Sequence, residues 1–335
     1  MLISDPTDVA ISLIAFVAAG LVSFSLSIAA TRVGRQSISL HLPNPGRIYG
    51  SQTVRIGGVV ILPAALIAML LTSMDPRSLV GIGACAIAIA GVGLADDIWD
   101  MPALGKLTGQ IAVAIAAVAF GVHIKVISSP LGGAIELGFV PGAALTVFWL
   151  VGMMNAINLL DGLDGLAPGV VLVAALTLSV LSANLGNGAL AVLGLALAGA
   201  IAGFLPFNVY RAKLILGDSG SNLLGFLIGT LAVLGQAKIG TALLVLGIPI
   251  LDVAWTIVRR YSSGRGIMDR DREHLHHRLL DSGLSRPQVT VLYVFLCAAF
   301  GASALLLEPA EKLIALGALA AVTAGLIYLG VKRSR

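Results

Sequence analysis

Charged residues are scarce in this sequence. Asp, Glu, Lys and Arg make up 11% of the 335 residues, whereas hydrophobic residues make up 58%. A soluble domain carries about 25% charged residues, and the mean hydropathy here is +0.99. This shortage excludes a soluble globular enzyme, a disordered chain and a coiled coil. The apolar runs do not alternate in polarity, which disfavours a β-barrel. The composition therefore predicts an all-α polytopic membrane protein.

Cysteine is almost absent as well. Cys85 and Cys297 both lie in apolar runs, so packing is their expected role, and neither a disulfide nor a metal site is implied. The excess of basic residues is small, giving a net charge of +4, and it lies between apolar segments. It therefore predicts membrane orientation rather than binding to nucleic acid.

Runs of about 20 apolar residues are long enough to cross the hydrocarbon core of a bilayer, and they predict eleven transmembrane helices. The runs cover residues 9–30, 56–74, 78–95, 104–122, 139–157, 167–184, 188–208, 219–235, 239–258, 288–306 and 311–331. A short turn at 184–187 separates the sixth run from the seventh. We expect residues 1–335 to form one integral membrane domain.

The basic residues are distributed unevenly between the two sides of this arrangement. If the N-terminus lies outside, 17 of the 21 Lys and Arg residues face the cytoplasm and four face outside. This bias predicts an external N-terminus and a cytoplasmic C-terminus. Asp5 and Asp8 precede the first run, so a cleavable signal peptide is not expected. The predicted cytoplasmic loops are 31–55, 96–106, 158–166, 209–218 and 259–287.

Acidic residues gather at the predicted cytoplasmic ends of helices, where ionisable groups are costly and hence candidates for function. Asp96 and Asp97 follow the third run. Adjacent carboxylates repel each other unless a cation or a proton lies between them. The alternative interpretation of this pair is a solvated turn in which an Asp caps a helix.

A second cluster places a polar residue at every third position after the fifth run. Its members are Asn155, Asn158, Asp161 and Asp164. Residues three apart share one face of a helix, so the spacing predicts a polar strip. The loop 158–166 contains no Lys or Arg. The strip therefore needs a metal ion or a partner from another loop, unless it is a simple polar cap.

A third cluster, Gly217-Asp218-Ser219-Gly220-Ser221-Asn222, precedes the eighth run. Asp218 or Ser219 could cap the following helix, which is a common use of these residues. The same geometry would point free backbone N–H groups and the positive end of a helix dipole inward. Such an N-terminus can bind phosphate.

A fourth cluster lies in the long loop 259–287. Its chemistry-bearing residues are Arg270, Asp271, Arg272, Glu273, His274, His276, His277 and Arg278. The histidine spacing is not that of a standard zinc site, and no cysteine accompanies it. Arginine together with histidine favours a phosphate-rich anion. Since hard carboxylate ligands suit Mg²⁺ shared with substrate phosphates, the clusters together predict phosphoryl transfer. The membrane scaffold makes a lipid phosphate a candidate substrate.

Five motifs, in order along the chain, resemble the polyprenyl-phosphate N-acetylhexosamine-1-phosphate transferases. That family includes the translocase that makes the first lipid intermediate of peptidoglycan. The motifs are Asp96-Asp97, Asn155-Ala-Ile-Asn-Leu-Leu-Asp-Gly-Leu-Asp-Gly165, Gly217-Asp-Ser-Gly-Ser221, Pro249-Ile-Leu-Asp252 and Asp271-Arg-Glu-His-Leu-His-His277. The resemblance implies transfer of a sugar 1-phosphate from a UDP-sugar to undecaprenyl phosphate, with release of UMP and a requirement for Mg²⁺ or Mn²⁺. It also implies a bacterial inner-membrane protein that acts at the cytoplasmic face and initiates a cell-envelope glycan.

The resemblance further implies roles for single residues. Asp218 and Asn158 would bind the metal or the diphosphate, with Asp97 assisting at the metal. Asp96 would deprotonate or orient the lipid phosphate, and Asp161 would belong to the same catalytic strip. Asp164 would contact the nucleotide, and the histidines and arginines of the fourth cluster would clamp the diphosphate and sugar. The substrate-binding set is Asp164, Asn155, Arg272, His274, His276, His277, Arg278, Arg47 and Arg55.

The resemblance also narrows the branch of the family. His-Leu-His-His at 274–277 resembles the N-acetylglucosamine-type branch, whereas the peptidoglycan translocase typically has three consecutive histidines. In the first loop, Pro43-Asn44, Arg47 and Arg55-Ile-Gly57-Gly58 fit the family. The usual basic-residue-plus-histidine ending instead reads Arg47-Ile48-Tyr49, and Val54 stands where a proline is expected.

Other interpretations remain open from sequence. An ion-coupled transporter could use the inner-face carboxylates, although it needs ionisable residues near the midplane, where Asp252 is the main one. A non-catalytic polyprenyl carrier is a third option. The sequence does not decide between N-acetylglucosamine and a 6-deoxy amino sugar, between lipopolysaccharide O-antigen, teichoic acid and capsule, between direct attack and an aspartyl intermediate, or between a monomer and a homodimer.

Overall fold

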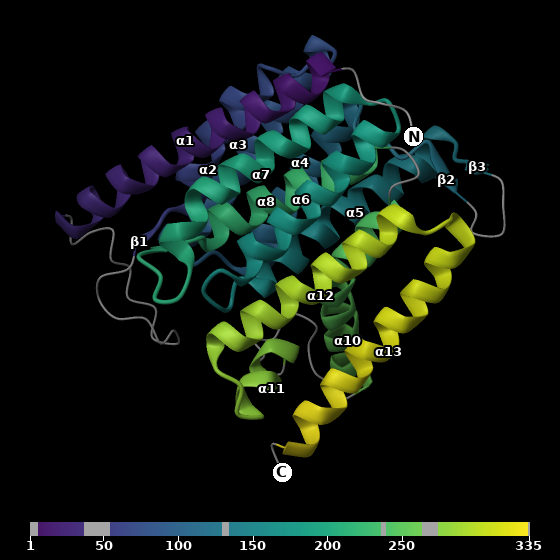
Figure 1. Cartoon of the computed structure of the whole chain (residues 1–335). Coiled ribbons are helices and arrows are strands. Elements are labelled where there is room, and N and C mark those ends of the chain that lie inside the picture. Colours follow the sequence, from purple (N-terminus) through teal and green to yellow (C-terminus); the bar gives the residue numbers. More distant parts are fainter. Residues whose placement is uncertain (1–5, 37–53, 129–133, 236–238, 263–273, 334–335) are drawn as a thin grey trace.

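The computed structural model describes residues 6–36, 54–128, 134–235, 239–262 and 274–333, and most of them are helical. The helices are α1 Pro6–Gln36, α2 Gly57–Met69, α3 Pro76–Trp99, α4 Ala103–Ala119, α5 Phe139–Leu160, α6 Leu166–Asn184, α7 Gly188–Asn208, α8 Gly217–Leu234, α9 Ile239–Val245, α10 Gly247–Ser262, α11 Leu275–Asp281, α12 Arg286–Leu306 and α13 Pro309–Arg333. Figure 1 shows them as a bundle, with α1 along one side and α13 at the opposite side.

The helical membrane fold predicted from composition is confirmed. Within the described residues, seven helices are long and apolar enough to cross a membrane, and α2 and α4 are shorter apolar helices. Large apolar side chains of α1 and α13 are exposed, as lipid-facing helices require; Leu21 of α1 is 62% exposed and Ile314 of α13 is 76% exposed. The sixth and seventh runs are separate helices, α6 and α7, as the sequence predicts.

The predicted ninth span is not one continuous helix. Its residues form α9, which ends at Val245, and α10, which begins at Gly247. Pro249 lies in the first turn of α10, where its missing N–H cannot bond to the carbonyl of Val245. Proline is therefore tolerated at the start of a new helix but would interrupt one that ran through this position.

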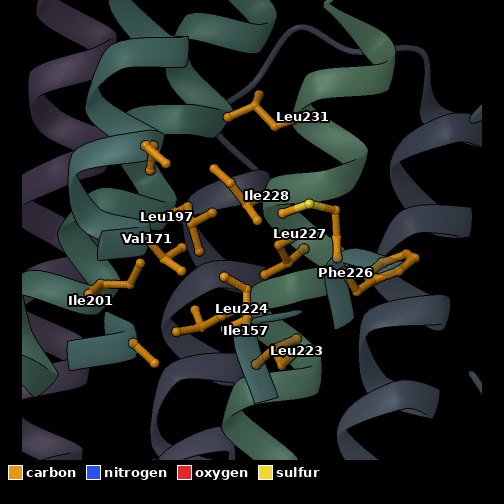
Figure 2. Close-up of a cluster of buried hydrophobic side chains, with 14 of the residues drawn as sticks. Ile157, Val171, Leu197, Ile201, Leu223, Leu224, Phe226, Leu227, Ile228 and Leu231 are labelled. Carbon is orange, nitrogen blue, oxygen red and sulfur yellow. The ribbon is translucent and has the colours of Figure 1, made fainter. Parts of the chain in front are cut away.

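Helix α8 lies at the centre of the bundle. It is buried along nearly its whole length and contacts α2, α3, α5, α6 and α7. Figure 2 shows its apolar side chains, among them Leu224, Phe226 and Ile228, packed against Ile157 of α5 and Val171 of α6. Because α8 is surrounded by helices rather than lipid, its first turn is held inside the protein.

Two small sheets occur in connections that the sequence analysis treated as loops. Strand β1 (Val54–Arg55) pairs in parallel with β4 (Leu214–Ile215), immediately before α8. Strands β2 (Val126–Ser128) and β3 (Ala134–Glu136) form an antiparallel pair between α4 and α5. Figure 1 shows β1 and the β2–β3 pair at opposite ends of the bundle. The β1–β4 pair joins the first loop to the entrance of α8.

Glycines allow α2 and α3 to approach the first turn of α8. A Cβ atom added to Gly58 of α2 would lie 2.5 Å from the carbonyl carbon of Ser219, and one added to Gly93 of α3 would lie 2.3 Å from the carbonyl oxygen of Asp218. Both distances are shorter than any tolerable contact. The backbone of α8 is thus fixed by two neighbouring helices at the turn that carries Asp218.

We expect Gly93→Ala to destabilise the protein by about 1–3 kcal/mol, because the new methyl group forces α3 away from α8. The measurement is the apparent melting temperature of the purified protein in detergent. Gly91→Ala is the matched control, since a Cβ at Gly91 meets nothing within 4 Å and alanine favours the helix. Equal melting temperatures for the two variants would contradict the close approach of α3 and α8.

Candidate active site

Three oxygen atoms from three helices meet at one ammonium group. The Nζ atom of Lys106, in the first turn of α4, lies 3.0 Å from Oδ2 of Asp96 and 3.1 Å from Oδ1 of Asp218. It also donates to Oδ1 of Asn158 at 3.2 Å. These side chains come from the end of α3, the start of α8 and the end of α5. The acids predicted from separate motifs are therefore brought together around one cation.

Further hydrogen bonds fix the oxygens of this cluster. Asp96 accepts the backbone N–H of Met101 through Oδ1 at 2.9 Å, so its other oxygen faces Lys106. The amide nitrogen of Asn158 donates to Asp218 and, at 2.8 Å, to the hydroxyl of Ser221. Both ends of the Asn158 amide are thereby engaged within the cluster, which fixes its orientation.

Asp97 has a different position from its neighbour Asp96. Its two carboxylate oxygens accept the backbone N–H groups of Asp218 and Ser219, each at 3.0 Å. The residue before α8, Leu216, provides no side-chain cap. Asp97 is buried, with 6% exposure, and Nη2 of Arg55 lies 3.9 Å from Oδ1. The cap of α8 is therefore a carboxylate from another helix, α3, rather than a side chain next to the start of α8.

This capping corrects the expectation that the start of α8 offers free N–H groups to a phosphate. The N–H groups of Asp218 and Ser219 are bound by Asp97, and that of Gly217 is bound by Oδ2 of Asp161 at 3.2 Å. The capping interpretation was also wrong about the accepting side chains, because the carboxylates that cap α8 come from α3 and from the segment after α5 rather than from within the third cluster.

The predicted polar strip is helical only in its first half. Helix α5 ends at Leu160, so Asn155 and Asn158 share a helical face, whereas Asp161 and Asp164 lie in the turn that follows. Gly165 has a φ of +72° at the start of α6. Such a backbone favours glycine, and it turns the chain away from the line of α5. The repeat of three therefore does not place all four polar residues on one helix.

Asp164 stabilises the loop that precedes β4. Its Oδ2 atom accepts the N–H of Ala212 at 3.2 Å, and its backbone carbonyl accepts the hydroxyl of Thr290 at 3.1 Å. Asn208 binds the same region, accepting from the N–H of Gly165 at 3.0 Å and donating to the carbonyl of Leu214 at 2.8 Å. The nucleotide contact predicted for Asp164 stays a prediction.

The histidine cluster is anchored by Asp252 of α10. Oδ1 of Asp252 accepts the N–H of Leu275 at 2.9 Å, and Oδ2 lies 3.5 Å from Nδ1 of His274. This buried carboxylate thus caps the short helix α11, which carries His276 and His277. The motif Pro249-Ile-Leu-Asp252 therefore has two structural roles. Pro249 lies at the break in the ninth span, and Asp252 holds the histidine cluster; the sequence pattern predicted neither role.

His276 brings the histidine cluster next to the turn after α5. A Cβ atom added to Gly162 would lie 2.5 Å from its Nε2 atom, so only glycine fits there. The ring is 1% exposed, and its two nitrogen atoms have no hydrogen-bond partner among the residues that the structure describes. Burial, followed by the nearby His277 and His274, lowers the pKa of His276 well below its usual value. His276 is therefore neutral near pH 7.

The remaining predicted residues divide into two groups. Arg278 lies on α11, and Asn155 donates to Gln110 of α4 at 2.8 Å. Arg47 and Arg272 lie outside the described residues.

Among the residues that the structure describes, no three His, Cys, Asp or Glu side chains form a metal-ligand group. The oxygens around Lys106 belong to two carboxylates and one amide.

Sequence reasoning missed Lys106, although a signal was present. It is the one basic residue of the predicted loop 96–106, and a basic residue at the cytoplasmic end of an apolar run is explained by topology alone. Its position four residues before Gln110 on an amphipathic α4 was the available signal, because it places a charge and a polar amide on one helical face.

We expect Asp252→Asn to loosen α11, because the amide group cannot keep both acceptor contacts of the carboxylate. Hydrogen exchange measured by mass spectrometry should become faster across residues 274–281. The matched control is Asp281→Asn at the exposed end of the same helix. Unchanged exchange in Asp252→Asn would show that this carboxylate does not hold the histidine cluster.

Comparisons with known proteins identify the family of this chain. The family model described as glycosyl transferase family 4 matches residues 79–236. The chain is 37% identical to a decaprenyl-phosphate N-acetylglucosaminephosphotransferase of Mycolicibacterium smegmatis, over 82% of this chain and 77% of that protein. It is 34% identical to a probable undecaprenyl-phosphate N-acetylglucosaminyl 1-phosphate transferase of Bacillus subtilis, over 80% of this chain and 77% of that protein.

A third relative is the undecaprenyl-phosphate alpha-N-acetylglucosaminyl 1-phosphate transferase of Escherichia coli K12. It is 32% identical, over 67% of this chain and 64% of that protein. The long matches to the mycobacterial and Bacillus proteins extend well beyond the region of the family model on this chain. The chain belongs to glycosyl transferase family 4, among the polyprenyl-phosphate N-acetylhexosamine-1-phosphate transferases that its motifs resemble.

Proposed function

We propose that this protein transfers N-acetylglucosamine 1-phosphate from UDP-N-acetylglucosamine to a polyprenyl phosphate such as undecaprenyl phosphate. UMP is released, and a lipid-linked sugar diphosphate is formed. The observation that carries the proposal is the convergence of Asp96, Asn158 and Asp218 on Lys106 inside a membrane bundle. The names of the three relatives support the lipid phosphate and the sugar. They give no support to the transporter alternative.

The proposed topology has eleven spans, an external N-terminus and an active site at the cytoplasmic face of the bacterial inner membrane. The distribution of Lys and Arg supports this orientation. The pairing of β1 with β4 and the bonds from Asp97 to α8 bring Val54–Arg55, the end of α3 and the start of α8 together, which supports a common face for these segments. In this arrangement α9 and α10 together would make the ninth crossing.

The oxygen cluster fits Mg²⁺. Two carboxylates and one amide oxygen converge on a single point that a cation, the Lys106 ammonium, already occupies. Oxygen ligands of this kind suit Mg²⁺, which commonly shares its coordination with substrate phosphates. We propose that Asp218 and Asn158 hold it, with Asp96 beside them facing the lipid phosphate. A bound Mg²⁺ would neutralise charge on the diphosphate and stabilise the departing UMP.

The protein's own groups then have separate tasks. Asp96, held by the N–H of Met101, would orient the lipid phosphate and accept its proton. Lys106 would turn from the carboxylates toward the diphosphate and stabilise the charge that develops there. In the reaction, an oxygen of the lipid phosphate forms a bond to the phosphorus atom that carries the sugar. The bond from that phosphorus to the oxygen bridging to UMP breaks, and the electron pair leaves with UMP.

The histidine cluster, which lies against the turn after α5, would bind the sugar diphosphate. His276 is neutral, and its ring nitrogens have no partner in the described part of the chain, so it can exchange hydrogen bonds with phosphate or sugar oxygens. Gly162 allows this ring to lie against the turn that begins at Asp161. Arg278 of α11 would add positive charge to the same binding surface.

The central test measures UMP release and the lipid product by mass spectrometry, using purified protein, undecaprenyl phosphate, Mg²⁺ and a panel of UDP-sugars. UDP-N-acetylglucosamine should give turnover. Asp218→Asn should lower kcat by about 10²–10³ or more, whereas Asp75→Asn, at the capped start of α3, should behave as wild type. Folded wild-type protein without turnover on any UDP-sugar would refute the proposed function, and an active Asp218→Asn variant would remove Asp218 from the site.

Lys106→Met should separate catalysis from metal binding. The variant should lose about 10²-fold in kcat, because a charge-stabilising group is removed. It should bind Mn²⁺ more tightly, because the ammonium no longer competes for the oxygens of Asp96 and Asp218. Electron paramagnetic resonance of free Mn²⁺ measures this affinity without turnover. Lys125→Met, at an exposed position between α4 and β2, is the control. Weaker Mn²⁺ binding in Lys106→Met would contradict the proposal that the metal and the ammonium share one position.

A further inference from the structure

Three amide side chains form a buried chain of hydrogen bonds beside the proposed site. Asn155 of α5 donates to Oε1 of Gln110 of α4 at 2.8 Å, and Nε2 of Gln110 donates to Oδ1 of Asn222 of α8 at 2.7 Å. Asn222 in turn donates to the backbone carbonyl of Asp218 at 2.7 Å. Gln110 and Asn222 are completely buried. We call Gln110, Asn155 and Asn222 the amide layer.

Each member of the amide layer lies one helical turn from a residue of the oxygen cluster. Gln110 is four residues after Lys106 on α4, and Asn222 is four residues after Asp218 on α8. Asn155 is three residues before Asn158 on α5. The same three helices therefore form two layers, with the charged cluster toward the end of the bundle and the amides one turn deeper.

The hydrogen bonds of the layer run in one direction. Each amide nitrogen donates to the next oxygen, so reversing one amide would place donor against donor or acceptor against acceptor. Gln110 joins the other two amides and uses both ends of its side chain. In a buried environment such a chain is strengthened by low polarity, and a broken link leaves polar groups without partners.

Apolar packing alone does not fix the rotation and height of the helices relative to one another. Contacts between apolar side chains have no direction, and helices in lipid associate without a hydrophobic driving force between them. A directional bond between helices fixes both their rotation and their height. Misplacement of a reacting group by about 1 Å can lower a rate by about 10²-fold. The oxygens around Lys106 come from separate helices, so their convergence depends on such alignment.

We propose that the amide layer is a positioning device for the reaction, with Gln110 as its central member. It aligns α4, α5 and α8 so that Lys106, Asn158 and Asp218 reach one point. Gln110 and Asn222 act through the helices and do not touch the substrates. The effect on turnover rests on the proposed function, whereas the effect on α8 does not.

The first test is Gln110→Met, which keeps the length of the side chain and removes its polar atoms. We expect kcat for sugar-phosphate transfer to fall by 10-fold or more, with the KM for UDP-N-acetylglucosamine changing by less than 3-fold. Hydrogen exchange of the first turn of α8, residues 217–222, should also become faster. Thr146→Val is the matched control, because Thr146 is a buried polar residue of α5 far from this layer, bonded to Gly142 and Ile124.

The second test is Gln110→Glu, which can keep both bonds while the introduced carboxyl is protonated. Its hydroxyl can donate to Asn222, and its carbonyl can accept from Asn155. Turnover relative to wild type should therefore be rescued at low pH. It should be lost as rising pH ionises the buried carboxyl, because the donor to Asn222 is then gone. The melting temperature of the variant is measured over the same pH range, because ionisation of a buried carboxyl also destabilises the fold; a loss of turnover at a pH where the protein is still folded identifies the positioning role.

The outcomes separate the two proposals. If wild-type protein shows no turnover but Gln110→Met still speeds exchange in the first turn of α8, the proposed function fails, while the alignment of α8 by the amide layer stands. If wild type turns over and both Gln110 variants match Thr146→Val in kcat and exchange at every pH, the positioning role is wrong. If Gln110→Met does not fold, Gln110→Glu decides through its pH profile.

Discussion

The contact between the carboxylate of Asp97 and the first N–H groups of α8 determines where the site lies. A carboxylate at a helix N-terminus satisfies unpaired donors and interacts favourably with the helix dipole. Here the carboxylate belongs to α3, so the cap also joins two helices. Gly93 and Gly58 permit the close backbone approach that this bond requires. This junction therefore determines the direction of the Asp218 side chain and its distance from Lys106.

The acidic residues at this end of the bundle serve two purposes. Asp97, Asp161, Asp164 and Asp252 bind backbone N–H groups and thereby fix the start of α8, the loop before β4 and helix α11. Asp96 and Asp218 instead face the ammonium of Lys106. In a protein with so few charges, most of the acids near the site build its frame. This division explains how a cluster of like charges can exist at the end of an apolar bundle.

Much of the fold could be predicted from hydropathy, because long apolar runs and their basic flanks follow directly from the bilayer. Pro249 could have predicted the break between α9 and α10, but this break is missed when only the length and hydropathy of the apolar run are considered. The motifs correctly brought Asp96, Asn158 and Asp218 to one place. Other contacts near the site could not be predicted from the sequence. The cap from Asp97 and the pairing of Val54 with Leu214 join segments that are distant in sequence. Lys106 was hidden, since topology already explains a basic residue at that position.

The distance along the chain between the two halves of the Asp97 cap has a consequence for biosynthesis. Asp97 and Ser219 are 122 residues apart, and a ribosome adds about 5–20 residues per second. The carboxylate of Asp97 thus waits on the order of 10 s for the helix that it caps. During that time the two N–H groups that Asp97 binds have not yet been made. A nascent chain that ends before α8 lacks the turn that carries Asp218, so ligand binding at this place begins only after the central helix has been made.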